Sequence, residues 1–252
     1  WRSSFTCTHE PWLAEFGLAV ADPNTTANCA ATLDEWKRWA ITPEGRVLSR
    51  WHNDDGDAMP GTFDAKSGYY EAQWGYLLDS QPSYVVCVAE QFDLSGDLPW
   101  LRSHRDTCRA ALEYMLRRDR DHDGLMEVIP ESSREEKASD WIDIVWASHE
   151  NALVNAEMYE ALTRWASLEE LLLGDAARSA RYRDAAARLK AAFNKPIADG
   201  GFWNPDRGWY VYWREADGSV HGDNLVTPVN FAAIGYGLCD DPARRREILA
   251  QI

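Results

Sequence analysis

The chain has 252 residues, 45% of them hydrophobic and 27% charged, which is typical of a globular protein with a sizeable buried core. Lys and Arg number 26 against 41 Asp and Glu, so the net charge of −15 disfavours nucleic acids and anionic membrane surfaces. We therefore expect no nucleic-acid partner. No apolar run is long enough to cross a bilayer either, so we expect no membrane partner; a neutral ligand such as a sugar fits this charge.

The chain from residue 82 onward repeats one unit, a helix followed by a short turn and a second helix. We expect residues 1–81 to be rich in loops, with at most one further hairpin. Aspartates open the second helices and act as N-caps, and Pro follows one of them directly. The repeat predicts three helical hairpins: 82–94 with 98–118, 150–173 with 176–193, and 229–238 with 242–252.

The two helices of each hairpin differ in composition. The first members are apolar on most faces, whereas the second members carry arginine-rich polar stripes. A helix that is apolar all round is buried, and one with a polar stripe faces solvent. The pattern therefore predicts a mainly α fold, an α/α toroid with inner and outer helices. An ordinary helical bundle is the alternative.

The segments between hairpins combine aromatic residues with Asp, Asn and Gly. They span 41–81, 119–148 and 199–227. Residues 201–203 and 209–213 flank a turn and predict a small β-hairpin. Loops of this composition on a rigid helical scaffold are where binding sites usually lie.

No pattern in the sequence predicts a metal or another cofactor. The run from Asp119 to Gly124 begins like an EF-hand calcium loop, but Pro130 occupies the position that needs a bidentate Glu. We therefore expect an Asp-rich turn there. The five cysteines include no CxxC pair, which argues against zinc. An odd number of cysteines does not form a complete disulfide framework, so the sequence leaves a cytoplasmic or a secreted location open. It leaves the oligomeric state open as well.

Two carboxylates, Asp140 and Asp143, lie three residues apart among Trp and Ile side chains. Burial beside indoles disfavours the charged form of an acid and raises its pKa. A raised pKa is what a general acid needs to protonate a glycosidic oxygen near neutral pH. Alternatively, Asp140 caps a helix while Asp143 accepts hydrogen bonds from backbone amides.

The run from Asp119 to Leu162 resembles the six-hairpin glycosidases: an Asp-rich turn, a loop, an apolar residue followed by Asp, and an inner helix. The segments 88–101 and 224–238 resemble other hairpins of these families. The resemblance covers about residues 80–250 and implies an (α/α)6 ring that hydrolyses glycosidic bonds of a carbohydrate substrate, often with inversion. By position it assigns the general acid to Asp143, with Asp140 second.

Aromatic faces and hydroxyl acceptors in the loops predict the sugar contacts. The candidates for substrate binding are Trp51, Asp54, Asp55, Gln73, Trp74, Trp141, Trp146, His149, Glu150, Asn151 and Asn224.

A full ring needs six hairpins, and the sequence contains three clear ones. We therefore expect residues 1–252 to form part of one (α/α)6 catalytic domain, which leaves open a second carboxylate outside the chain. Two alternatives differ in class. One is a sugar epimerase, isomerase or lyase on the same ring, and an epimerase of that architecture would need His149 and His221 as its pair. The other is a non-catalytic carbohydrate-binding fragment, which would lack a second carboxylate facing Asp143.

Overall fold

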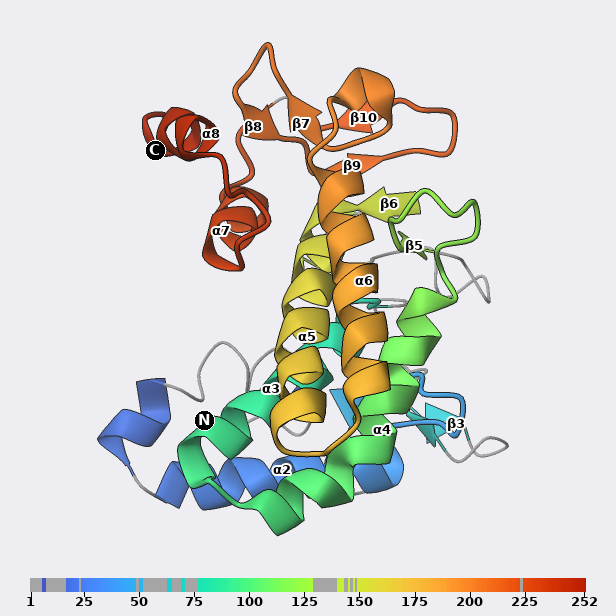
Figure 1. Cartoon of the computed structure of the whole chain (residues 1–252), viewed down its shortest axis with the longest axis vertical. Coiled ribbons are helices and arrows are strands. Elements are labelled where there is room, and N and C mark those ends of the chain that lie inside the picture. Colours follow the sequence, from blue (N-terminus) through green and yellow to red (C-terminus); the bar gives the residue numbers. More distant parts are fainter. Residues whose placement is uncertain are drawn as a thin grey trace.

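The computed structural model describes residues 6–7, 17–22, 24–48, 50–51, 63–64, 69–70, 77–128, 140–142, 145, 147, 149–222 and 224–252. The described part of the chain is built mainly of helices, with short strands in the connections (Figure 1). The helices are α2 (Asn24–Trp39), α3 (Ser80–Ser95), α4 (Leu98–Leu116), α5 (Ala152–Leu171), α6 (Ala176–Phe193), α7 (Thr227–Gly235) and α8 (Pro242–Leu249).

The three predicted hairpins are α3–α4, α5–α6 and α7–α8. Asp97, Asp175 and Asp241 accept hydrogen bonds from backbone N–H groups in the first turns of the second helices, so each is the predicted N-cap. Gly96 ends α3 with a φ of 66°, a left-handed conformation that Gly adopts at little cost.

Burial separates inner from outer helices as the composition predicts. In α3, 12 of 16 residues are buried, against 7 of 19 in α4. The values are 12 of 20 in α5 and 7 of 18 in α6. Helix α5 packs against both α3 and α7, so the first helices of the three hairpins line one continuous inner layer. The described helices thus form part of an α/α toroid.

Several predicted helix boundaries are wrong. Glu150 belongs to a strand, because backbone pairing on both sides extends residues 149–151, and α5 begins at Ala152. Helix α7 starts at Thr227 and ends at Gly235, two residues before Gly237, whose φ is 83°. Helix α8 ends at Leu249.

Helix α2 lies within residues 1–81, for which the sequence analysis named no individual helix. It packs against α3, and the buried Trp36 indole donates a hydrogen bond to the Leu48 carbonyl (3.1 Å). The Val47 amide donates to the Gln81 side chain (2.8 Å), which ties this segment to the first turn of α3.

Short strands gather where α5 begins and α6 ends (Figure 1). A four-stranded antiparallel sheet has the order β10-β9-β6-β5. The predicted β-hairpin is present as β7 paired with β8. The strands are β1 (Thr6–Cys7), β2 (Arg50–Trp51), β3 (Phe63–Asp64), β4 (Tyr69–Tyr70), β5 (Glu127–Val128), β6 (His149–Asn151), β7 (Trp203–Asn204), β8 (Trp209–Tyr210), β9 (Trp213–Arg214) and β10 (Val220–His221).

Among the described helices, none combines the length and the apolar composition that a bilayer span requires.

Candidate active site

Three buried carboxylates meet near the start of the inner helices. Asp79 immediately precedes α3, Glu157 lies in the second turn of α5, and Asp140 lies in the connection between the two hairpins. Their exposed fractions are 0%, 3% and 1%, in that order. Acids are rarely buried without a partner cation, so this carboxylate cluster is the chief candidate for a functional site.

Asp79 occupies the N-cap position of α3, but its side chain does not cap the helix. It accepts a hydrogen bond from the backbone N–H of Trp141 (2.6 Å) instead. Its second oxygen, Oδ1, has no hydrogen-bond partner among the described residues. This N-cap position thus holds a carboxylate for the cluster.

Asp140 is held on both oxygens. Oδ1 accepts from the backbone N–H of Ile142 (2.8 Å), and Oδ2 accepts from the Asn151 amide (2.7 Å). The Tyr212 hydroxyl lies 3.0 Å from Oδ1 and 2.9 Å from Oδ2 and donates to this carboxylate. Residues 141 and 142 are not helical, so the alternative prediction that Asp140 caps a helix is wrong.

Burial dominates the electrostatics of the cluster. It raises the pKa of Asp79 well above its ordinary value, and the negative charge of Asp140 raises it further. Burial also raises the pKa of Glu157, with additional repulsion from Asp79 and Asp140. Oε2 of Glu157 is buried with no hydrogen-bond partner in the described part of the chain. The arrangement favours a proton on Asp79 or Glu157 at neutral pH.

Three residues that the sequence analysis selected lie in the cluster or bind it: Asp140 is a member, and Trp141 and Asn151 donate hydrogen bonds to its carboxylates. Trp141 is half-buried and packs against the core, and its backbone N–H binds Asp79. Asn151 also caps α5 by accepting from the Val154 N–H (3.1 Å).

Other selected residues lie outside the described residues, including the predicted general acid. These are Asp54, Asp55, Gln73, Trp74, Asp143 and Trp146, and only the backbone of Trp51 is described.

Glu150 lies outside the carboxylate cluster, although it is next to Asn151. Neighbouring residues of a strand point to opposite faces, and Asn151 points to Asp140. Glu150 pairs instead with Arg214 across the sheet (3.4 Å). Burial raises the pKa of Glu150 to about 7, with Asp123 adding to the effect.

The two remaining candidates are His149 and Asn224. His149 adopts a left-handed φ of 53° and approaches Glu150 (3.8 Å), while Asn224 is exposed.

The Asp-rich turn has the local structure predicted for it. Carboxylate oxygens of Asp119, Asp121 and Asp123 lie within 4.8 Å of one another. Each accepts a backbone N–H of the turn: that of Gly124, Asp123 and Leu125, respectively. These bonds account for the aspartates as turn formers.

Sequence reasoning missed Asp79, Glu157 and Tyr212. The available signal for Glu157 was an acid within the apolar run 152–158 of an inner helix, where a charge must be buried. Asp79 directly precedes α3, where an Asp commonly caps a helix, so its position gives no other signal. No local signal distinguishes Tyr212, because only the sheet brings it to Asp140.

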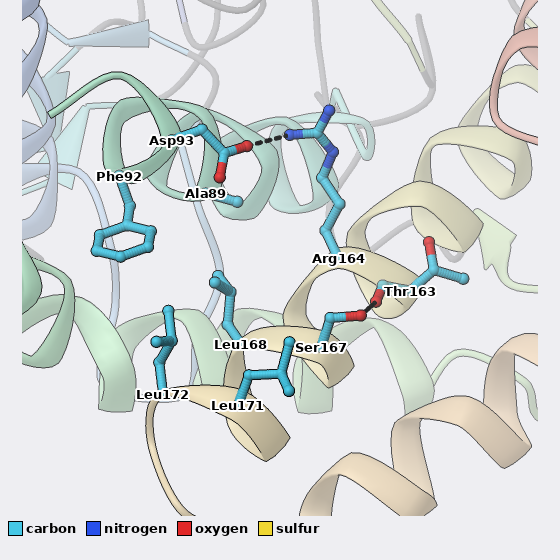
Figure 2. A pocket seen from close by; sticks show the side chains of 9 residues that line it. All are labelled: Ala89, Phe92, Asp93, Thr163, Arg164, Ser167, Leu168, Leu171 and Leu172. Atoms are coloured by element: carbon cyan, nitrogen blue, oxygen red, sulfur yellow. Dashed lines mark hydrogen bonds and ion pairs between the residues drawn. The ribbon is translucent and has the colours of Figure 1, made fainter. Parts of the chain in front are cut away.

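A separate pocket of about 500 Å³ lies between the later turns of α3 and α5. Figure 2 shows Arg164 reaching Asp93 across it, beside Leu168, Leu171 and Leu172. Ser167 is ten residues after Glu157, so the pocket is about 15 Å further along α5 than the carboxylate cluster. It is therefore a distinct feature from the candidate active site.

Comparison with known proteins identifies the family of the chain. Residues 11–243 match the family described as the bacterial alpha-L-rhamnosidase six-hairpin glycosidase domain. No curated protein matches the chain.

Three solved structures illustrate the similarity in fold. A rhamnosidase from Klebsiella oxytoca with rhamnose bound is 19% identical, with a TM-score of 0.58 over 87% of this chain and 37% of that one. The unsaturated glucuronyl hydrolase of a Bacillus species is 15% identical, with a TM-score of 0.61 over 97% of this chain and 63% of that one. The mannosylglycerate hydrolase of Thermus thermophilus is 16% identical, with a TM-score of 0.58 over 87% of this chain and 63% of that one.

The chain thus spans 37 to 63% of the length of these three structures. At these identities the structural matches establish the fold alone. Together with the family match, they confirm the resemblance to six-hairpin glycosidases that the sequence predicts.

Proposed function

Because this chain belongs to the family of bacterial alpha-L-rhamnosidase six-hairpin glycosidase domains, we propose that it hydrolyses a glycosidic bond by carboxylate acid–base chemistry. The observation that carries the proposal is the buried pair of Asp79 and Asp140 near the start of the inner helices. An α-L-rhamnoside is the first substrate class to test, since the family match and the Klebsiella structure both name it.

The two carboxylates suit different roles. A general acid must hold its proton at the working pH, and burial raises the pKa of Asp79. Asp140 accepts from three donors, which favour its carboxylate form. When their environments push the pKa values of two acids apart in this way, one site supplies both an acid and a base. Asp79 is thus the proposed proton donor and Asp140 its ionised partner.

Asp143 remains the proton donor that the sequence predicts. Its position three residues after Asp140 makes it the direct alternative to Asp79. The sugar contacts of the loops, including Trp51, Asp54 and Trp74, also remain predictions.

An epimerase with His149 and His221 as its pair is less well supported. The two histidines lie on β6 and β10, which are separated by β9 in the sheet. Strands two places apart are about 9.5 Å from each other. His221 also stacks on the Trp213 ring, with centroids 4.4 Å apart.

The test measures Asp79→Asn, Asp140→Asn and Asp143→Asn on two rhamnosides, one with an activated aryl leaving group and one with a sugar leaving group. Loss of general acid catalysis lowers the rate by about 10²–10⁴ on the sugar leaving group and far less on the aryl group. We expect that contrast for Asp79→Asn. Asp140→Asn should reduce both rates.

The matched control is Asp97→Asn, which changes a helix cap on another turn. A selective loss in Asp143→Asn, with Asp79→Asn unaffected, would move the acid to Asp143. A wild-type protein that releases no sugar from rhamnosides or other glycosides would contradict the proposed hydrolysis.

A further inference from the structure

We propose that Tyr212 is a positioning residue that holds Asp140 as a carboxylate and thereby leaves the proton of the pair on Asp79. The inference rests on the proposed function for its catalytic consequence, and its structural part concerns the protonation of Asp140 alone.

The Tyr212 hydroxyl is placed to bond the whole carboxylate group. It lies nearly equidistant from both oxygens of Asp140, at 3.0 and 2.9 Å. A phenol can donate one proton to either oxygen, and each oxygen already accepts one N–H, from Ile142 or from Asn151. Three donors among the described residues therefore converge on this one buried acid. Donors to the charged form stabilise it against protonation.

Tyr212 reaches the carboxylate cluster because the sheet fixes its backbone. Its carbonyl accepts from the Ala152 N–H (2.8 Å) at the start of α5. Its own N–H donates to the His221 carbonyl (2.8 Å). A Cβ at Gly222, next to His221, would lie 2.6 Å from the Tyr212 nitrogen. The backbone around Tyr212 is thus closely packed, and the residue is only 3% exposed.

The Tyr212 phenol matters because the other titratable groups beside Asp140 in the described part of the chain are themselves acids. Among the described residues, the titratable neighbours of Asp140 are Asp79 before α3, Glu157 on α5 and Tyr212, and the first two are carboxylic acids. Burial, followed by the charge of Asp140, raises the pKa of Tyr212 well above its usual range. The phenol therefore stays protonated and donates at every working pH.

Within the pair of Asp79 and Asp140, a shared proton goes to the acid with fewer donors to its charged form. Asp79 accepts from Trp141 on one oxygen, and its Oδ1 has no partner in the described part of the chain. Without the phenol, Asp140 competes for the proton, and the fraction of molecules with a protonated Asp79 and a charged Asp140 falls. Tyr212 thus sets the protonation pattern without being required to touch substrate.

The test compares Tyr212→Phe with Tyr210→Phe. Both remove a hydroxyl from a buried tyrosine of the same segment, but the Tyr210 hydroxyl donates to Asn194 (2.7 Å), away from the cluster. The acid limb of the kcat/KM profile should shift upward by about one pH unit in Tyr212→Phe, because a bond to a charged group is lost. We expect kcat to fall about tenfold with KM little changed. In Tyr210→Phe the profile should stay in place.

The same shift is measured without turnover by the carboxyl ¹³C signal of Asp140, assigned by its loss in Asp140→Asn. Its midpoint should rise by about one pH unit in Tyr212→Phe. Replacement of Tyr212 by 4-aminophenylalanine, which restores an N–H donor, should return the midpoint toward the wild-type value.

A wild-type midpoint in Tyr212→Phe would overturn the inference and leave the phenol a packing role. Equal shifts in both Phe variants would overturn it as well. If the wild-type protein hydrolyses no glycoside, the proposed function fails, whereas the ¹³C midpoints still decide the role of Tyr212.

Discussion

Helix α5 buries two glutamates in contrasting ways. Glu169, which is fully buried, binds Arg109 through both oxygens (2.7 and 2.6 Å) and accepts from the Trp165 indole (2.9 Å). Glu157 lies about 18 Å earlier on the same helix and is buried equally well. Yet its Oε2 has no partner in the described part of the chain, and its nearest charged neighbours are the acids Asp79 and Asp140.

The contrast separates structural acids from candidate functional ones. Breaking a buried ion pair costs several kcal/mol, so Glu169 is tied to folding. Acids crowded together with no cation beside them among the described residues oppose folding at neutral pH, so a reason other than stability must account for Glu157 and Asp79. The clustering of such groups is typical of active sites.

The largest expected effect comes from removing Arg109, the cation that pairs with Glu169. Arg109→Met leaves Glu169 buried without its guanidinium partner, and the free energy of unfolding should fall by about 3–5 kcal/mol. Urea denaturation at pH 7 measures it. The control is Arg105→Met on the same helix, whose ion pair with Asp106 is exposed and worth less than about 0.5 kcal/mol. Equal losses would show that Glu169 is not held as described.

Glu157→Gln should have the opposite effect on stability. Because burial raises the folded-state pKa of Glu157, the wild type loses stability as pH rises above the unfolded value of about 4.5. The neutral amide avoids that loss. The variant should therefore melt at a higher temperature than the wild type at pH 8, and the advantage should disappear at pH 4. Glu169→Gln, the matched substitution, should lower the melting temperature at pH 8. A destabilised Glu157→Gln at pH 8 would contradict the assignment.

A smaller pH effect is expected from Glu90, which lies on the inner helix α3. Burial raises its pKa to about 7, against the opposing effect of Arg164 at 3.7 Å. Its contribution to stability is therefore present below about pH 4.5 and is lost as pH rises through 7. Glu90→Gln should flatten the melting temperature between pH 5 and 8, measured by calorimetry. If the melting temperature of Glu90→Gln falls with pH as steeply as that of the wild type, other acids cause the fall.

The smallest effect concerns Asp175, which caps α6 and also contacts Arg109 (3.0 Å). Asp175→Ala should lower the melting temperature slightly through the lost cap, as measured by calorimetry. Asp175→Asn keeps a capping oxygen and should lower it less. If the two variants lose the same stability, the ion pair of Asp175 with Arg109 contributes more than the cap, because both substitutions remove that ion pair.

The helical organisation could be read from the sequence because its signals are local. Capping at Asp97, Asp175 and Asp241 depends on residues within one turn, and the inner and outer classes depend on periodicity within one helix. The start of α5 was misplaced because the strand before it is defined by partners more than 20 residues away in sequence.

The candidate site was predicted only in part. Asp140 was found because an acid among tryptophans is unusual in one sequence window, and Asn151 because it begins an inner helix. Asp143, first in the sequence prediction, lies outside the described residues.

The sequence by itself thus determined the hairpin repeat, the toroid class and the segment that carries Asp140, since each depends on short-range patterns of polarity. Tertiary structure alone decided that Asp79, Glu157 and Tyr212 meet around it. These three belong to different elements, and Tyr212 is 72 residues from Asp140. The pKa of a carboxyl group depends on burial and on charges within a few ångströms, and both are established only when the inner helices and the sheet pack together.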